Sequence, residues 1–168
     1  MNILDANRIN INSPYKVWND DEAIQFDTDY GIRYAVDFDV DSNPFFQAYW
    51  LNLTNRTHKP SPNDKNIAKT IICIIEEFFR LNPDVLLYMC STDNNQQAQR
   101  ARLFLYWFSG YEQQKKYLIK SAEVSSLDPN GKKTKEYVAL IVQRKHPFLD
   151  DIVRHFNEDV QLFNDSKP

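Results

Sequence analysis

Glycine and cysteine are scarce in this sequence. Only three of its 168 residues are glycine, which nearly excludes the glycine-rich loops that bind phosphate groups. The two cysteines, Cys73 and Cys90, lie in apolar segments, and this favours buried, reduced thiols over a disulfide framework. Reduced thiols are typical of the cytoplasm, so we predict a cytoplasmic location.

Long apolar runs are also missing. No run reaches the roughly 18 apolar residues that a membrane-spanning helix needs. The first residues show no basic region followed by an apolar one, as a signal peptide would. The three histidines do not stand at zinc-ligand spacing with one another or with the cysteines. We therefore expect neither a membrane partner nor a metal ion.

Aromatic residues, by contrast, are plentiful, and the length suffices for one domain with a real core. We expect a single domain over residues 1–168, with residues 1–14 and 164–168 frayed. The formal net charge is −3, but bases outnumber acids between residues 93 and 145. That part of the chain is the candidate for a basic surface.

Alternation of apolar and polar residues predicts the strands, and helical spacing predicts the helices. We predict strands at residues 15–18, 23–28, 32–40, 45–54, 85–90, 117–124 and 136–144. Helices are predicted at residues 64–81, between the strand 85–90 and Tyr111, and from Pro147 onward. This layout is α+β, with helices packed on a mixed, mostly antiparallel sheet.

The same patterns predict which side chains are buried. The segment from Val85 to Cys90 has no polar position, so this strand should be covered on both faces. The polar residues of the helix 64–81, Glu77 among them, should face water. One face of the strand 32–40 should be buried, namely Ile32, Tyr34, Val36, Phe38 and Val40. The last helix should bury Leu149, Val153, Phe156, Val160 and Phe163.

Polar residues crowd the elbow that follows the strand 85–90. Asp93 and Gln96 have the spacing of a capping box, which favours a purely structural start of the next helix. The alternative is an anion site at the same helix start, formed by Ser91 and Asp93, with Arg100 reaching back from the following turn. The sequence leaves both interpretations open.

The order of predicted elements between residues 32 and 144 resembles the central part of the GCN5-related N-acetyltransferase fold. In that family, the helix after the strand meander binds the cofactor pyrophosphate on its N-terminal amides, through a loop patterned Q/R-x-x-G-x-G/A. The corresponding window here, residues 63–68, keeps the small last residue but lacks the glycine and carries Asp64. The resemblance implies acetyl-CoA or another acyl-CoA as cofactor, held near Asn63, Asn66 and Ala68.

A second motif of that family concerns catalysis. Residues 105–111, LYWFSGY, resemble the L-Y-x-x-x-G-F motif, whose tyrosine protonates the departing thiolate. The resemblance implies that Tyr106 is the general acid, and a base would come from Asp37, Asp39 or Glu123. The alternative interpretation is structural, with Gly110 ending a helix and Tyr106 an ordinary aromatic residue.

The stretch from residue 86 to residue 108, with His146-Pro147, is also similar to an uncharacterised family of short bacterial proteins from Bacteroides-like organisms. That resemblance implies no activity. Two hypotheses follow, and whether the protein is an enzyme stays open. The first is a divergent acyl-CoA-dependent N-acyltransferase, active or degenerate. The second is a non-catalytic interaction protein that uses the elbow or the basic hairpin to bind a protein or nucleic-acid partner, or a second copy of itself; the negative net charge disfavours nucleic acid.

Overall fold

The computed structural model describes residues 1–91, 105–106 and 108–165. The chain divides into two units. We call residues 1–41 and 49–84 the N-terminal unit, and residues 42–48 and 85–168 the C-terminal unit. Both units contain helices and strands, and the strand pairings within each are antiparallel. The predicted α+β class with mostly antiparallel pairing is therefore confirmed.

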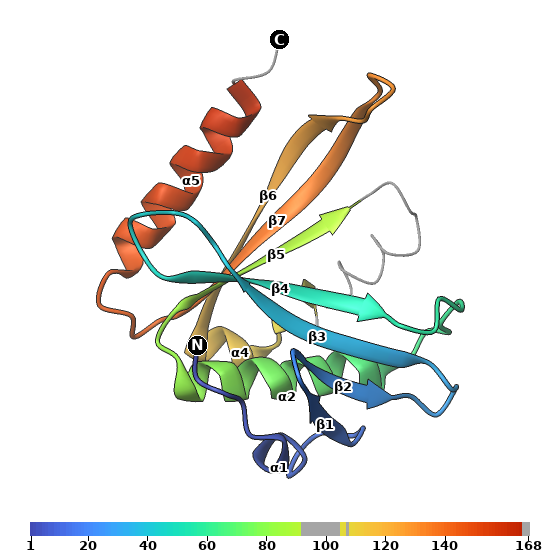
Figure 1. The fold of residues 1–168 in the computed structure, drawn as a ribbon. Coiled ribbons are helices and arrows are strands. Elements are labelled where there is room, and N and C mark those ends of the chain that lie inside the picture. Colours follow the sequence, from blue (N-terminus) through green and yellow to red (C-terminus); the bar gives the residue numbers. More distant parts are fainter. Residues whose placement is uncertain (92–104, 107, 166–168) are drawn as a thin grey trace. The chain divides into compact units, whose positions relative to one another are not determined.

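Four strands of the N-terminal unit form an antiparallel meander in chain order (Figure 1). They are β1 (Val17–Asp20), β2 (Ala23–Asp27), β3 (Arg33–Val40) and β4 (Ala48–Asn55). β4 begins later than predicted, because the side-chain oxygen of Asn43 accepts hydrogen bonds from the amides of Phe45 and Phe46 and turns the chain there. Phe45 is consequently exposed instead of lying in a strand.

The helical layer of the N-terminal unit is α2 (Lys65–Leu81), which begins after the N-cap residue Asp64. Apolar residues at helical spacing bury one of its faces, namely Ile71, Ile74, Ile75, Phe78 and Phe79. The Phe78 ring stacks on Phe38 of β3 with ring centroids 5.1 Å apart, and meets Tyr49 of β4 edge-on. These contacts join the helix to the meander.

A short helix, α1 (Ala6–Ile9), precedes the strands, in a region where the sequence shows no periodic signal. The Asp5 side chain caps it by accepting a hydrogen bond from the Asn7 amide. Leu4 and Ile9 are buried. The N-terminal segment therefore contributes to the core of its unit.

Three strands of the C-terminal unit pair antiparallel to one another. β5 (Val85–Ser91) pairs with β7 (Lys133–Gln143), which pairs with β6 (Tyr117–Leu127). α4 (Tyr111–Lys116) leads directly into β6, and α5 (Leu149–Asp165) follows β7. Figure 1 shows α5 running beside the β6–β7 hairpin, and hydrogen bonds join the two.

The β6–β7 hairpin is longer than predicted and runs in uninterrupted register over eleven residue pairs. Its turn is fixed by Asp128, whose side chain accepts hydrogen bonds from the amides of Asn130 and Lys132. Gly131 completes the turn with φ +80°, a value that glycine adopts without steric cost. The turn chemistry therefore sets the register of the whole hairpin.

Burial departs from the sequence-based prediction in the strands β3 and β5 and in the helix α5. In β5 the residues from Val85 to Leu87 are buried, but Met89 is 46% exposed, so the strand is not covered on both faces along its whole length. In β3 the predicted buried face stops before Val40, the last residue of the strand, which is exposed. In α5 only Ile152 and Phe156 are buried, so most of the predicted apolar face stays outside the core.

Candidate functional site

The N-terminus of α2 is the place where the sequence predicts a cofactor pyrophosphate. Asn63 is exposed in the preceding loop, Asn66 lies in the first turn, and Ala68 is buried. The Asn66 amide donates a hydrogen bond to Oδ1 of Asp64 at 2.9 Å. The amide predicted to bind the cofactor therefore already binds a carboxylate of the chain itself.

Asp64 is held in turn by Tyr15. The Tyr15 hydroxyl donates a hydrogen bond to Oδ2 of Asp64. Burial, helped by this hydrogen bond, raises the pKa of Tyr15 to about 12. The Tyr15 ring stacks on Phe26, which stacks on Tyr34. This stack of three rings fixes the Asp64 carboxylate at the start of α2.

Tyr106, the predicted general acid, belongs to the C-terminal unit and has 77% of its surface exposed. The helical turn that carries it is closed by Ser109, whose amide and hydroxyl both donate hydrogen bonds to the Leu105 carbonyl. The hydroxyl of Tyr106 is accessible, whereas Asn66 and Ala68 belong to the N-terminal unit.

The three carboxylates predicted as bases lie in different surroundings. Asp37 and Asp39 share one face of β3, and both accept a hydrogen bond from the Asn52 side chain at 2.7 Å. Glu123 lies on β6 and pairs with Lys135 at 3.1 Å, which lowers the pKa of Glu123. A carboxylate with a lowered pKa is a weak base at neutral pH.

The predicted elbow site falls mostly outside the described residues. Ser91 is the last residue of β5, where it pairs with Glu136 of β7. Asp93 and Arg100 lie outside the described residues, as does Gln96 of the predicted capping pair. The elbow site therefore stays a prediction.

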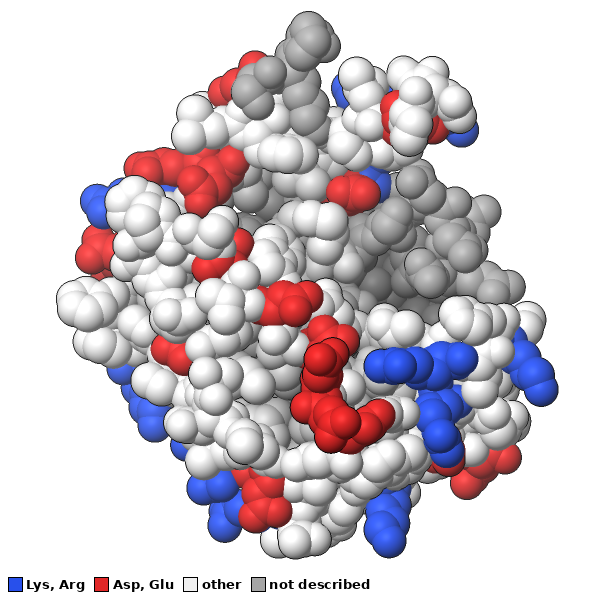
Figure 2. Space-filling model, in the orientation of Figure 1, with Lys and Arg blue, Asp and Glu red and all other residues white. Residues whose placement is uncertain are grey.

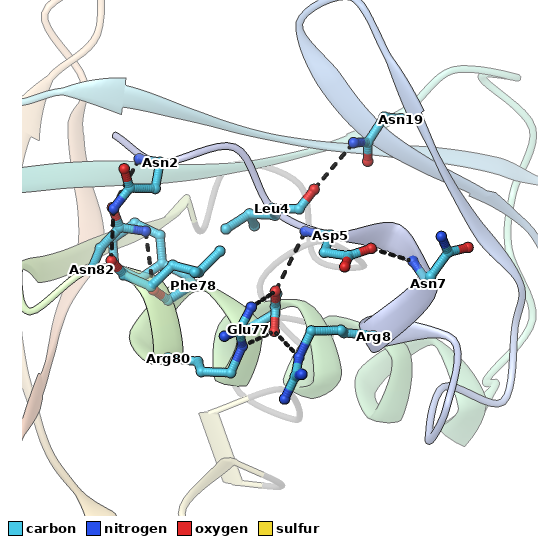
Figure 3. Close-up of polar contacts among 11 residues, drawn as sticks. Asn2, Leu4, Asp5, Asn7, Arg8, Asn19, Glu77, Phe78, Arg80 and Asn82 are labelled. Carbon is cyan, nitrogen blue, oxygen red and sulfur yellow. Dashed lines mark hydrogen bonds and ion pairs between the residues drawn. The ribbon is translucent and has the colours of Figure 1, made fainter.

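Sequence reasoning missed a buried charge cluster on α2. Glu77, predicted to face water, is only 5% exposed. Its carboxylate accepts two hydrogen bonds from Arg80, each at 2.8 Å, and Arg8 lies 3.7 Å away (Figure 3). The Asp5 amide donates a longer hydrogen bond at 3.4 Å. The hydrogen bonds from Arg80 lower the pKa of Glu77, so the carboxylate stays ionised in spite of its burial.

The cluster anchors the N-terminal segment to α2. Figure 3 shows a second contact between this segment and the end of α2, at Asn2. The backbone N–H of Asn2 donates a hydrogen bond to Oδ1 of Asn82 at 3.0 Å. The cavity beside Glu77 measures about 190 Å³, which is below the range of about 300–1,000 Å³ usual for ligand pockets. Partners on every side and little free volume make a structural role the better interpretation of Glu77.

The outer edge of β6 carries backbone groups that do not bond to β7. The backbone groups of even-numbered residues in β6 form the hydrogen bonds to β7. Two bonds fix this pattern: Arg144 N donates to Lys116 O at one end of the ladder, and Asp128 N donates to Lys132 O at the turn. The N–H and C=O groups of odd-numbered residues therefore point outward. Among the described residues, no backbone group pairs with those of Ile119 and Ser121.

Asn164, near the end of α5, covers the next part of this edge. Its Oδ1 accepts a hydrogen bond from the Ser125 amide at 3.2 Å, and its Nδ2 donates one to the Glu123 carbonyl at 3.1 Å. A carboxamide bonded in this way reproduces the pair of hydrogen bonds that a neighbouring strand would make. The edge of β6 is thus protected at Glu123 and Ser125.

Two lysines lie before and within the uncovered stretch of the edge. Lys116 ends α4, and Lys120 lies between Ile119 and Ser121 on β6. Both are exposed, and within the described part of the chain neither forms an ion pair. Positive charge at this place favours a negatively charged partner.

A family model, described as a family of unknown function (DUF6169), matches residues 63–158, more than half of the chain. The protein belongs to DUF6169. No curated protein and no solved structure matches this DUF6169 chain. An uncharacterised family, as predicted from the sequence, is confirmed, whereas a bacterial origin and an acetyltransferase-like element order stay predictions.

The DUF6169 region begins just before α2 and ends within α5. It contains the whole β6–β7 hairpin, and therefore the uncovered stretch at Ile119 and Ser121. Asn164 lies beyond it. The uncovered stretch of the β6 edge thus lies in the family region, whereas Asn164, which covers the next part of that edge, lies outside it.

The described residues form neither a metal-binding cluster nor a membrane-spanning helix. Within them, no group of three or more His, Cys, Asp or Glu side chains could hold a metal ion. None of the helices described for this DUF6169 protein is long and apolar enough to span a membrane.

Proposed function

We propose that this DUF6169 protein is a non-catalytic interaction protein that binds an extended acidic segment of a partner protein along the outer edge of β6. The observation that carries the proposal is the pair of outward-facing residues Ile119 and Ser121, whose backbone groups have no backbone partner in the described part of the chain. Such groups can pair with an added strand, which then gains affinity from main-chain hydrogen bonds.

Two neighbouring features support this proposal. The hydrogen bonds of Asn164 match those of an added strand, so the geometry of the edge suits strand pairing. Lys116 and Lys120 place positive charge beside the uncovered stretch. They favour Asp or Glu in the added segment and disfavour a basic segment by like-charge repulsion.

Ser121→Pro tests the edge directly. The Ser121 N–H points away from β7, so proline removes an outward donor while leaving the bonds between β6 and β7 in place. Ser121→Thr is the matched control, because threonine keeps the N–H and has high strand propensity. The probe is an acetylated peptide of alternating threonine and glutamate, titrated by isothermal calorimetry into the full chain.

We expect the peptide to bind the wild-type protein and Ser121→Thr alike. Ser121→Pro should bind about tenfold more weakly, because a lost hydrogen bond with its desolvated partner costs about 1.4 kcal/mol. Equal affinity for both variants would overturn the edge as the binding site. Retention of single-stranded DNA that falls with salt, in place of peptide binding, would favour a nucleic-acid partner.

The acyl-CoA-dependent N-acyltransferase predicted from the sequence is the competing proposal. The accessible hydroxyl of Tyr106 supports it, and the Asp64 carboxylate on the Asn66 amide weighs against it. If acetyl-CoA or CoA binds the native state, millimolar cofactor should raise the melting temperature by mass action. Asp64→Asn should enlarge that shift, because it removes a negative charge and keeps a capping side chain. No shift in either protein would leave the interaction protein as the proposed function.

A further inference from the structure

We infer a second binding site, in the N-terminal unit, for a partner segment that carries Lys or Arg next to an apolar anchor residue. The site is a groove of about 410 Å³ bounded by the N-terminal segment, the β1–β2 hairpin and β3. It belongs to a different unit from the β6 edge and takes a segment of opposite charge. The inference therefore does not depend on the function proposed above.

The floor of the groove is apolar. Ile24 of β2 and Val36 of β3 are buried there, and Phe38 is half-buried. Leu4 closes the floor from the side of the N-terminal segment. The Asn19 side chain holds this segment in place by donating a hydrogen bond to the Leu4 carbonyl at 3.1 Å (Figure 3). The volume falls within the range of about 300–1,000 Å³ usual for ligand pockets.

Exposed apolar side chains extend this floor to the surface. Ile3 is 85% exposed and Met1 is 54% exposed, and both line the groove. Single exposed apolar residues are common, but two of them beside an apolar groove form a continuous apolar surface. Surfaces of this kind, rimmed by polar residues, are typical of binding sites.

The opposite rim of the groove is acidic. Asp20 ends β1, and Asp21 and Glu22 form the β1–β2 turn. All three line the groove, and the described residues that line it include no Lys or Arg. Oδ1 of Asp20 accepts a hydrogen bond from the Asp21 amide, and its Oδ2 accepts one from Gln25. Asp21 and Glu22 are exposed and form no ion pair with the described residues. Figure 2 shows Asp and Glu side chains gathered on this face, around the place that the β1–β2 turn has in Figure 1.

The combination of floor and rim selects the class of ligand. The N-terminal unit has thirteen Asp and Glu against eight Lys and Arg. Its net negative electrostatic potential therefore attracts cationic partners before they contact the groove. A simple cation would leave the apolar floor unused, and an apolar ligand would leave the carboxylates unpaired. A basic segment with an apolar anchor satisfies both, since the anchor fills the groove and the cations meet the rim.

Fluorescence anisotropy of a labelled peptide tests this inference on the full chain. The probe is fluorescein-labelled Gly-Lys-Lys-Leu-Phe-Lys-Lys-Gly. One control peptide has glutamate in place of lysine, and the other has Gly-Ser in place of Leu-Phe. The rim variant is Asp21→Asn with Glu22→Gln, and the floor variant is Ile3→Ser; all three positions are exposed, so the fold should tolerate them.

Asp150→Asn with Asp159→Asn is the matched control variant, because it removes two exposed charges from α5. We expect the rim variant to weaken binding of the probe about fivefold to tenfold. Ile3→Ser should weaken it about threefold. The α5 control should leave it unchanged, and binding should fall as salt concentration rises.

Three results would overturn the inference. They are absence of binding to the wild-type chain, equal binding of the glutamate peptide, and an equal loss in the rim variant and the α5 control. Ser121→Pro should leave binding of the lysine probe unchanged, because Ser121 lies on β6 and outside this groove. The two proposals can therefore fail separately.

Discussion

Glu77 illustrates how a charged side chain can be buried in a small unit. Burial alone would raise the pKa of a carboxyl group toward its neutral form. The two hydrogen bonds from Arg80 outweigh this effect and hold the pKa of Glu77 below its usual range. Arg8 and the Asp5 amide reach the same carboxylate from the N-terminal segment. One residue thus ties the first residues of the chain to α2.

Glu77→Gln should destabilise the fold by about 1–3 kcal/mol at neutral pH, because it removes the charge that Arg80 faces in a desolvated site. The folded-state pKa of Glu77 lies below the unfolded value of about 4.3. Its stabilisation is therefore complete above that pH and is lost as pH falls through the folded pKa. Urea unfolding at a series of pH values should show a constant gap between wild type and variant near neutrality, and a shrinking gap below about pH 4.

Glu76→Gln is the control for this experiment. Glu76 is the neighbouring carboxylate on the same helix, and it forms no ion pair with the described residues. Its replacement should change stability by no more than about 0.5 kcal/mol. Equal losses in the two variants, or a gap that persists unchanged into the acid range, would contradict the role given to Glu77.

Tyr15→Phe should destabilise the protein by about 1 kcal/mol, since it removes the hydrogen bond to Asp64. The pKa of Tyr15 is about 12 in the folded state and about 10 when unfolded. Above pH 10 the Tyr15 hydroxyl ionises in the unfolded chain but not yet in the folded one, which favours unfolding. The free energy of unfolding that wild type has in excess of the variant should therefore shrink as pH rises from about 10 to 12. Unfolding curves in alkaline buffers measure this.

Tyr30→Phe is the matched control, because Tyr30 is an exposed tyrosine between β2 and β3. It should leave stability unchanged within about 0.5 kcal/mol. An advantage of wild type over Tyr15→Phe that does not change between pH 9 and 11 would count against the interpretation of Tyr15.

At the scale of elements, the sequence predicts what local patterns determine. The bounds of α2 follow from Asp64 and a regular apolar stripe, and the β6–β7 turn follows from its Pro-Asn-Gly sequence. α1 is different, because a helix of four residues is too short to show the 3.6-residue apolar periodicity that predicts a helix. It is positioned by contacts such as that of Asp5 with Glu77, which lies 72 residues along the chain.

The candidate sites are less predictable than the elements for the same reason. Helix physics predicts an anion at the start of α2, but not that Tyr15, 49 residues earlier, would hold Asp64 there. Alternation predicts β6 as a strand, but not which of its edges stays unpaired. The cover at Ser125 comes from Asn164, 39 residues away, and a lone asparagine on a helix carries no signal of that contact.

Asn164→Ala should uncover the middle of the β6 edge. The amide of Ser125 loses its acceptor, so its hydrogen exchange should become faster. The Thr-Glu peptide should bind about threefold more tightly, because the added strand no longer competes with the side chain. Stability should change by less than about 1 kcal/mol, since the bonds lost are exposed.

Asn157→Ala provides the control, because it makes the same change of helix propensity at an exposed position of α5. It should alter neither the exchange of Ser125 nor the affinity for the peptide. Nuclear magnetic resonance follows both quantities in one titration. An affinity that is the same in all three proteins would mean that the added segment does not reach the stretch covered by Asn164.

At the scale of the whole molecule, the two units differ in charge. The N-terminal unit has thirteen acidic and eight basic residues, and the C-terminal unit has ten acidic and twelve basic ones. The overall value of −3 conceals this difference, which is why net charge says little about partners. The acidic groove and the β6 edge with its two lysines each have the sign of charge that is in excess in their own unit.

The family match cuts across these units. Residues 63–158 contain α2 but none of the strands from β1 to β4. The buried face of α2 depends on those strands, as the contacts of Phe78 with Phe38 and Tyr49 show. The matched region therefore includes only part of the N-terminal unit.

We consequently expect the isolated fragment 63–158 to fold incompletely. Without the meander, α2 would expose side chains that are buried in the full chain, namely Ile71, Ile74, Ile75 and Phe78. Each exposure costs roughly 1.5–3 kcal/mol. The fragment should bind the dye ANS, and it should lack a near-UV circular dichroism signal and a cooperative thermal transition. A chain of residues 1–165, which keeps the two units, should show the near-UV signal and the cooperative transition. A fragment 63–158 that unfolds cooperatively as a monomer would mean that the strands before α2 are dispensable, and that α2 finds another partner for its apolar face.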